Sequence, residues 1–144
     1  MSLDISVFKI PYTDFKQGIN KYFVQLWQTD WNNKPTNKLN IVKPTLGDTT
    51  LRNILKRRDE VVLHRARIGH THLTHCYLLQ GEDQPECIPC GEQLTVEHIL
   101  VNCLDFAVVR QKYYSTNNLN ELFNTVTLEN VINFLKDIKL YDKF

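Results

Sequence analysis

The chain has 144 residues, 42% of them apolar and 23% charged, which suits one small globular domain with or without an N-terminal extension. No apolar run approaches the ~20 residues that cross a bilayer, and the first residues lack the features of a secretory signal. We therefore expect an intracellular protein, nuclear, cytoplasmic or both, with no membrane partner. Reducing conditions there disfavour disulfides, so the four cysteines are expected to bind a metal or to remain as buried thiols.

The net charge of +1 hides two halves of opposite charge. Residues 1–75 contain 12 Lys or Arg and 6 Asp or Glu, whereas residues 76–144 contain 5 and 10, so the balances are +6 and −5. Because unlike charges attract, a polyanionic partner is expected to meet the first half of the chain.

Residues 1–48 predict one helix followed by an extended loop. After Thr13, a candidate N-cap, apolar residues recur at helical spacing until about Thr29: Phe15, Ile19, Tyr22, Phe23 and Leu26. The polar stretch 32–48, which contains Pro35, predicts a loop. Tyr22, Trp27 and Trp31 are expected in a core or a domain contact.

Residues 49–114 predict a basic helix and a metal-binding module. The helix starts near Leu51 or Asp59 and ends at Ile68, because Gly69 is a natural C-terminal stop. Shorter helices are expected from Thr71 or Thr74 to Leu79, from Thr95 to about Cys103, and, mostly buried, over 104–114. A turn-rich loop with a short hairpin near Cys87 separates the first two of these.

Residues 115–144 predict a helical tail. After a break at 115–118, Thr127 is expected to cap a final helix with an apolar stripe formed by Leu128, Val131, Ile132, Leu135 and Ile138. An alternating, β-branched pattern is almost absent from the chain. The predicted fold class is therefore mainly α, a small helical domain with a zinc-stapled loop and helix.

Four residues in the second half have the spacing of a structural zinc site, Cys-x2-Cys-x7-His-x4-Cys: Cys87, Cys90, His98 and Cys103. A Cys-x2-Cys turn supplies two thiolates from one tight loop, and Gly91 permits the positive φ that such a turn needs. These four ligands close the coordination of one Zn²⁺, so the site is expected to be structural, and Glu97 is expected to be a solvated carboxylate.

Two points about this site remain open at the level of sequence. Five residues of straight helix separate His98 from Cys103 by about 140°, so the helix must stop near Asn102 or bend. Cys76 is expected to be a buried thiol, although Cys76 or His75 could substitute as a ligand.

A basic segment precedes the zinc site, with two acidic residues among its cations. Its candidate nucleic-acid contacts, to RNA or DNA through residues 52–72, are Arg52, Lys56, Arg57, Arg58, Arg65, Arg67, His70 and His72. Arginines on one helix face suit phosphates, because the guanidinium binds them with two hydrogen bonds. On chemistry alone, the basic residues fit a solvated helix face with local salt bridges as well as they fit a nucleic-acid contact.

Two blocks in this region are recognisable, RIGHTHLTH over Arg67–His75 and LTVEHIL-x2-C over Leu94–Cys103. Together with the Cys-x2-Cys, they resemble a segment of jockey-like non-LTR (LINE-type) retrotransposon polyproteins, downstream of the reverse transcriptase and ribonuclease H domains. IPYTDFK and WQTDWN near the start and NVINFLKDIKLYDKF at the end resemble the flanks of this tail, so the likeness covers nearly the whole chain.

The resemblance implies a zinc-binding C-terminal tail that handles element RNA or target DNA. It implies no catalytic activity, because the polymerase's YADD-type motif is missing from this sequence. Residues 1–48 would then flank the ribonuclease H domain. A nucleic-acid module predicts a continuous positive surface formed by Arg57, Arg58, Arg65 and Arg67.

Two alternatives accompany this expectation. The tail could dock on the upstream ribonuclease H or reverse transcriptase domain, or the chain could be a non-functional fragment of an element. A docking tail predicts an exposed apolar patch lined by Phe15, Tyr22, Phe23 or Trp27.

Overall fold

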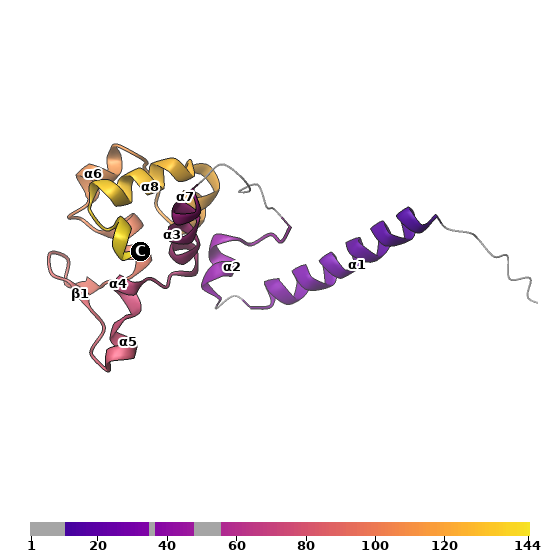
Figure 1. The fold of residues 1–144 in the computed structure, drawn as a ribbon, viewed down its shortest axis with the longest axis horizontal. Coiled ribbons are helices and arrows are strands. Elements are labelled where there is room, and N and C mark those ends of the chain that lie inside the picture. The colour runs from indigo at the N-terminus through magenta and orange to yellow at the C-terminus, as the bar shows by residue number, and fades with distance from the viewer. Residues whose placement is uncertain (1–10, 35–36, 48–55) are drawn as a thin grey trace, which may run out of the picture.

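The computed structural model describes residues 11–34, 37–47 and 56–144, and these are mainly helical, which confirms the predicted mainly α class (Figure 1). The elements are α1 (Tyr12–Asn32), α2 (Lys38–Val42), α3 (Arg57–Ile68), α4 (His72–His75), α5 (Tyr77–Gln80), β1 (Glu86–Cys87), β2 (Glu92–Gln93), η1 (His98–Asn102), α6 (Ala107–Gln111), α7 (Leu119–Thr125), α8 (Leu128–Asp137) and η2 (Tyr141–Lys143). In the described part of the chain, no helix combines the length and apolar character needed to cross a membrane.

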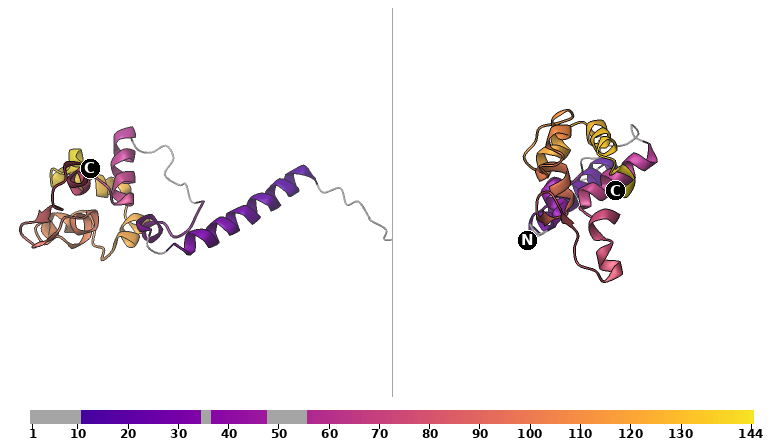
Figure 2. Two further views of the ribbon diagram at one scale, coloured as in Figure 1. Left: turned by 90° about the horizontal axis from the view of Figure 1, so that it is seen from below. Right: turned by 90° about the vertical axis from the view of Figure 1, so that its left-hand side faces the viewer.

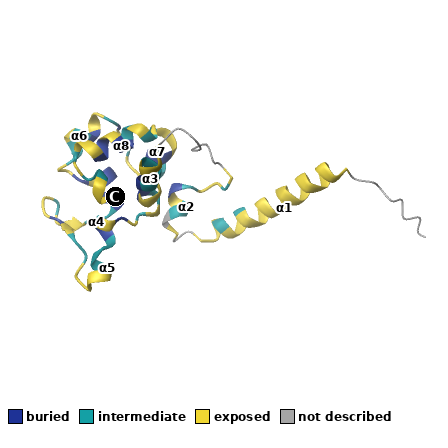
Figure 3. Cartoon of the chain, in the orientation of Figure 1, coloured by how far each residue is buried: buried dark blue, intermediate teal, exposed yellow. Residues whose placement is uncertain are grey.

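The hydrophobic core is formed mainly by α3, η1, α7 and α8 (Figure 3). The helix α8 has the predicted stripe, with Val131, Ile132 and Leu135 buried, and it also buries Phe134, which the sequence did not single out. Tyr114 packs edge-to-face on Phe134, with ring centroids 5.4 Å apart. These contacts fix α8 against the chain that follows the metal-binding segment.

The basic helix α3 begins at Arg57 and ends where predicted, at Ile68, and it is followed by Gly69, whose φ of 80° lies in the left-handed region. The amide of Gly69 donates to the carbonyl of Arg65 at 2.9 Å, which closes the last turn. The alternative start at Leu51 lies outside the described residues. Val62, Leu63 and Ala66 face the core, so Arg57, Arg58 and Arg65 are left exposed on the outer side.

The N-terminal helix α1 is longer than predicted and projects from the rest of the molecule (Figures 1 and 2). It starts after Pro11, not at Thr13, and no side chain caps it. Near its end, Trp31 Nε1 donates to the carbonyl of Lys43 at 3.0 Å, and Gln28 Nε2 donates to the carbonyl of Pro44 at 2.7 Å. The C-terminal end of α1 is thus tied to the segment after α2, while none of its residues is buried.

Two helices occupy segments for which the sequence predicted none. The predicted loop over residues 32–48 contains α2, which is capped by the Asn37 side chain and buries Val42. The helix α7 follows Asn118, whose side chain accepts a hydrogen bond from the Glu121 amide at 2.8 Å. Asn120 of α7 donates to the carbonyl of Ile41 at 2.7 Å, so these two short helices support each other.

Two predicted helices differ from the structure. The helix expected over 104–114 is reduced to α6, and Leu104 and Val108 are exposed, so the prediction that it is mostly buried was wrong. The helix expected over residues 71–79 is divided at Cys76 into α4 and α5. Thr71 does cap α4, in a reciprocal arrangement with Thr74.

Candidate metal centre

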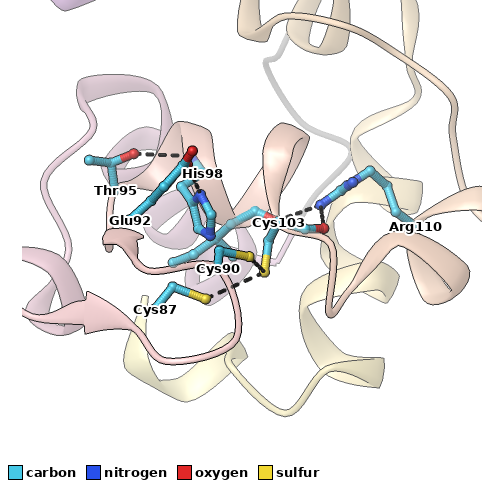
Figure 4. A network of polar contacts seen from close by, with 8 residues as sticks. Cys87, Cys90, Glu92, Thr95, His98, Cys103 and Arg110 are labelled. Carbon is cyan, nitrogen blue, oxygen red and sulfur yellow. Dashed lines mark hydrogen bonds and ion pairs between the residues drawn. The ribbon is translucent and has the colours of Figure 1, made fainter.

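The first two predicted ligands lie in a tight turn between β1 and β2 (Figure 4). The strands pair antiparallel, with Cys87 opposite Glu92. The carbonyl of Cys87 accepts hydrogen bonds from the amides of Cys90, at 3.1 Å, and Gly91, at 2.8 Å. Gly91 has a φ of 67°, as the sequence predicted, because the chain must reverse here. The hairpin thus holds two thiols on one turn.

The other two predicted ligands lie at the ends of a short widened helical turn. Thr95 Oγ1 accepts a hydrogen bond from the His98 amide at 3.0 Å, which starts the turn as predicted. The amide of Cys103 then donates to the carbonyl of His98 at 2.7 Å, an i→i+5 bond of the π type. Cys103 itself has φ −57° and ψ 123°, so the chain leaves the helix there. The helix both widens and stops at Asn102, which brings His98 and Cys103 to the same side.

The four predicted ligands form one compact group. Their ligand atoms all lie within 4.8 Å of one another. The Sγ atom of Cys103 is 3.7 Å from that of Cys87 and 3.9 Å from that of Cys90. A disulfide would need about 2.05 Å, whereas thiolates about 2.3 Å from one ion at tetrahedral corners lie about 3.8 Å apart. The cluster could therefore bind one metal ion, and no disulfide joins its cysteines.

His98 has the environment of a metal-ligating imidazole. Its side chain is buried, and Nε2 has no hydrogen-bond partner in the protein. The other ring nitrogen, Nδ1, lies 3.0 Å from Glu92 Oε2. A carboxylate on one ring nitrogen fixes the tautomer and directs the lone pair of the other nitrogen toward an ion. An ion held by the three thiolates would give Nε2 the partner that it lacks.

The residues after Cys103 contribute backbone amides to the thiols. A hydrogen bond from the backbone of Leu104 lowers the pKa of Cys90, whereas burial raises the pKa of Cys103 to about 11. The first effect favours the thiolate form that binds metals, and the second opposes it. A bound cation would offset the cost of the Cys103 thiolate because it stabilises the charged form.

Arg110 and Tyr114 donate hydrogen bonds to backbone carbonyls of the widened turn. Nη2 of Arg110 donates to the carbonyl of Cys103 at 2.8 Å and to that of Ile99 at 3.4 Å, and the Tyr114 hydroxyl donates to the carbonyl of Leu100 at 3.1 Å. Both side chains are buried, and burial raises the pKa of Tyr114. The sequence analysis missed both residues and Glu92. The one available signal was that Arg110 is the single arginine of residues 76–144.

The other residues considered for the site lie apart from this group. Glu97 is exposed, as predicted, and it is Glu92 that contacts the histidine. Cys76 is half-buried at the junction of α4 and α5, and His75 stacks on His70 with ring centroids 3.9 Å apart. Neither belongs to the group of ligand atoms.

The predicted nucleic-acid contacts are distributed around α3 and beyond its ends. Arg52 lies outside the described residues, whereas Lys56, Arg57, Arg58 and Arg65 are exposed. Arg58 pairs with Asp142 at 3.2 Å, and Arg65 Nη1 donates to the carbonyl of Phe144 at 2.9 Å.

The remaining three residues of that set differ in exposure. Arg67 is half-buried over the ring of Phe123, and this burial lowers the pKa of its guanidinium. His70 and His72 are exposed after the end of α3.

No protein-family model, curated protein or solved structure matches the chain. The function has to be inferred from the site and the surface.

Proposed function

We propose that this chain is a zinc-stabilised module that binds the phosphate backbone of RNA or DNA and has no catalytic activity of its own. The observation that carries the proposal is the outer face of α3, where exposed basic side chains gather and α3 itself contributes no acidic one. The resemblance of Arg67–His75 and Leu94–Cys103 to the tail of non-LTR retrotransposon polyproteins agrees with this reading.

Zinc is the metal that best fits the cluster. Three thiols and one imidazole are a donor set that Zn²⁺ prefers, and four protein ligands are the mark of a structural site. The ion would join the hairpin at Cys87 and Cys90 to the turn that ends at Cys103, and Arg110 holds the carbonyl of that last residue. Because protein side chains would fill all four coordination positions, the role that we propose for zinc is structural.

The surface proposed for nucleic acid is the outer arc of α3. At 100° per residue, Arg57, Arg58, His64 and Arg65 fall within about 120° of the helix circumference. Asp59 falls outside that arc, and its carboxylate accepts a hydrogen bond from the Tyr141 hydroxyl at 2.6 Å. Exposed basic side chains on one face suit a polyanionic backbone.

The proposed surface also includes a lysine of α8 that the sequence did not suggest. Lys136 of α8 and Arg58 of α3 both lie over the ring of Tyr141, at 4.9 Å and 5.7 Å from its centroid. The exposed pair between Arg58 and Asp142 is worth little in water, so phosphate can replace the carboxylate. Lys136, whose Nζ lies 3.9 Å from Asp59 Oδ1 and whose side chain stays 51% exposed, adds a cation beside the three exposed arginines.

Salt-titrated binding tests the proposal. For duplex DNA, each phosphate contact contributes about 0.9 to the slope of log affinity against log salt. We expect the variant Arg57→Gln/Arg58→Gln/Arg65→Gln to reduce that slope by up to about 2.7. A matched control, Lys21→Gln/Lys112→Gln/Lys139→Gln, removes the same charge from exposed sites elsewhere and should leave most of the slope.

Two results would overturn the proposal. One is binding to RNA and to single- and double-stranded DNA that is absent or independent of salt. The other is an equal loss in the two triple variants, since this would indicate attraction to net charge and not a contact by α3. Arg65 also holds the carbonyl of Phe144, so the unfolding midpoint of each variant is measured alongside.

A further inference from the structure

The helix α1 is exposed along most of its length (Figure 3), and nothing in the described structure covers its long apolar face. Its five aromatic side chains on this face are 55–76% exposed: Tyr12, Phe15, Tyr22, Phe23 and Trp27. Ile19 and Leu26 lie among them and are also exposed. This exposure is what a docking tail predicts, and it concentrates on one side of one helix.

The attachment of α1 to the rest of the molecule leaves this face open. Trp31 and Gln28 make the hydrogen bonds to residues 43–46, and at 100° per residue they lie about 120° and 180° round the helix from Ile19. The apolar face therefore points away from the segment that anchors the helix. Its side chains are held neither by that anchor nor by the core.

A helix of this composition needs a partner to be stable in water. It has no side-chain N-cap, no basic residue in its last turn and a glycine, Gly18, in its interior. Most helical stability in proteins comes from packing of an amphipathic face, and Gly costs about 1 kcal/mol relative to Ala inside a helix. Its apolar face is thus the part whose burial would stabilise the helix most.

We infer that two copies of this chain pair through α1, in an antiparallel arrangement with a two-fold axis near Phe23. The helix has 21 residues, so its axis is about 32 Å long and can form a seam with an equal helix. At about 200 Å² per aromatic side chain, the five exposed rings offer about 600 Å² per copy. Two copies bring together about 1,200 Å², which reaches the size of a specific interface.

Charge selects the antiparallel orientation. Lys16 and Asp30 are the charged residues on the stripe that runs through Phe23, and each is seven residues, about two turns, from it. A two-fold axis at Phe23 places each Lys16 opposite the Asp30 of the other copy, whereas a parallel pair would place like charges together. Asp30 also pairs with Lys34 at 2.7 Å, but its side chain stays 61% exposed and accessible.

Sedimentation of the full 144-residue chain, loaded with zinc, tests this inference over a range of protein concentrations. The wild-type chain should form a dimer as concentration rises. Phe23→Ser should weaken the dimer at least about 30-fold, because it removes an aromatic contact from both copies at the centre of the seam. Val24→Ser is the matched control, because Val24 is exposed about 140° away from Ile19 and should leave the dimer intact.

A charge swap tests the orientation. Lys16→Glu should weaken the dimer about tenfold, since it creates two repulsive pairs, and Lys16→Glu/Asp30→Lys should restore it. Failure of the double variant to recover rejects the antiparallel register. A chain that stays monomeric at high concentration, or that forms open assemblies, overturns the closed pair and leaves the α1 face to a different protein. Unchanged zinc content and unfolding midpoints show that each variant keeps its core.

Discussion

Two helices of this chain have amphipathic sequences, and the fold uses them in opposite ways. The helix α8, with ten residues, buries Val131, Ile132, Phe134 and Leu135 in the core. The helix α1 has 21 residues and buries none. Figure 3 shows the contrast between the body of the molecule, residues 56–144 with α2, which has buried residues, and the projecting α1, which is exposed along most of its length.

The difference shows what an apolar period does and does not specify. The spacing predicts which side of a helix will seek a partner, but the partner is set by what the rest of the chain can bring there. For α8 the partner lies in the same chain, because α3, α6 and η2 pack on it. For α1 the described residues supply no partner, and the one that we propose is a second copy of the chain. Substitutions in α1 and in the core should therefore have different effects.

Loss of the metal should have the largest effect, and it should fall on the body. Cys103→Ser removes a buried thiol from the centre of the cluster. Structural zinc sites contribute folding free energy directly, about 10–16 kcal/mol in small zinc-folded peptides. Here the core supplies part of the stability, so we expect a loss of at least about 3 kcal/mol. Zinc release and urea unfolding measure it.

The chain provides its own control for this prediction. Cys76→Ser changes a half-buried cysteine outside the cluster, and it should leave zinc content unchanged. Glu92→Gln should weaken zinc binding by about 10–100-fold, as loss of a partner to a ligating histidine does. Glu97→Gln should not. A Cys103→Ser chain that keeps its zinc and its midpoint would show that the four residues do not form one site.

Truncation of core and surface aromatics should give the next largest contrast. Phe134→Ala in α8 leaves a cavity in the core and should cost about 3–5 kcal/mol. Phe23→Ala in α1 should change the free energy of unfolding of the dilute monomer by less than about 0.5 kcal/mol. Urea unfolding at low protein concentration measures both. Equal losses would mean that α1 packs on the core in solution.

The fold could be predicted where local chemistry decides it. The end of α3 follows from Gly69, the stripe of α8 from its period, and the turn after Cys87 from Gly91. The helices α2 and α7 could not be predicted, because five and seven residues are too few for helix propensity to act without packing. Their stability comes from contacts such as that of Asn120 with the carbonyl of Ile41.

The candidate metal site, too, could be predicted from the sequence only in part. Its four ligands follow from a sequence spacing, and so does the conflict between His98 and Cys103 on a straight helix. That conflict is resolved by one i→i+5 hydrogen bond, which the sequence does not encode in a recognisable way. Glu92 reaches His98 because of the register of the hairpin between β1 and β2. Arg110 reaches the carbonyl of Cys103 because α6 folds back onto the widened turn. These supporting contacts depend on tertiary structure.

The smallest predicted effect concerns the ionisation of Tyr141, which joins the end of the chain to α3. Burial raises its pKa to about 12, and the hydrogen bond that its hydroxyl donates to Asp59 acts in the same direction. The unfolded value is about 10. Because the folded pKa is the higher one, this group's contribution to stability is fully present below about pH 10 and is lost as the pH rises from about 10 to 12.

Ultraviolet titration of the phenol groups measures this directly. Tyr141→Phe should remove one late-ionising phenol from the curve. Asp59→Asn should move that phenol to lower pH, because it removes the charge that opposes the phenolate and leaves burial as the main cause. Both variants should leave self-association through α1 unchanged, since Asp59 and Tyr141 belong to the body. A wild-type curve in which no phenol beyond those of Tyr113 and Tyr114 ionises late would show that the contact between Tyr141 and Asp59 does not persist in solution.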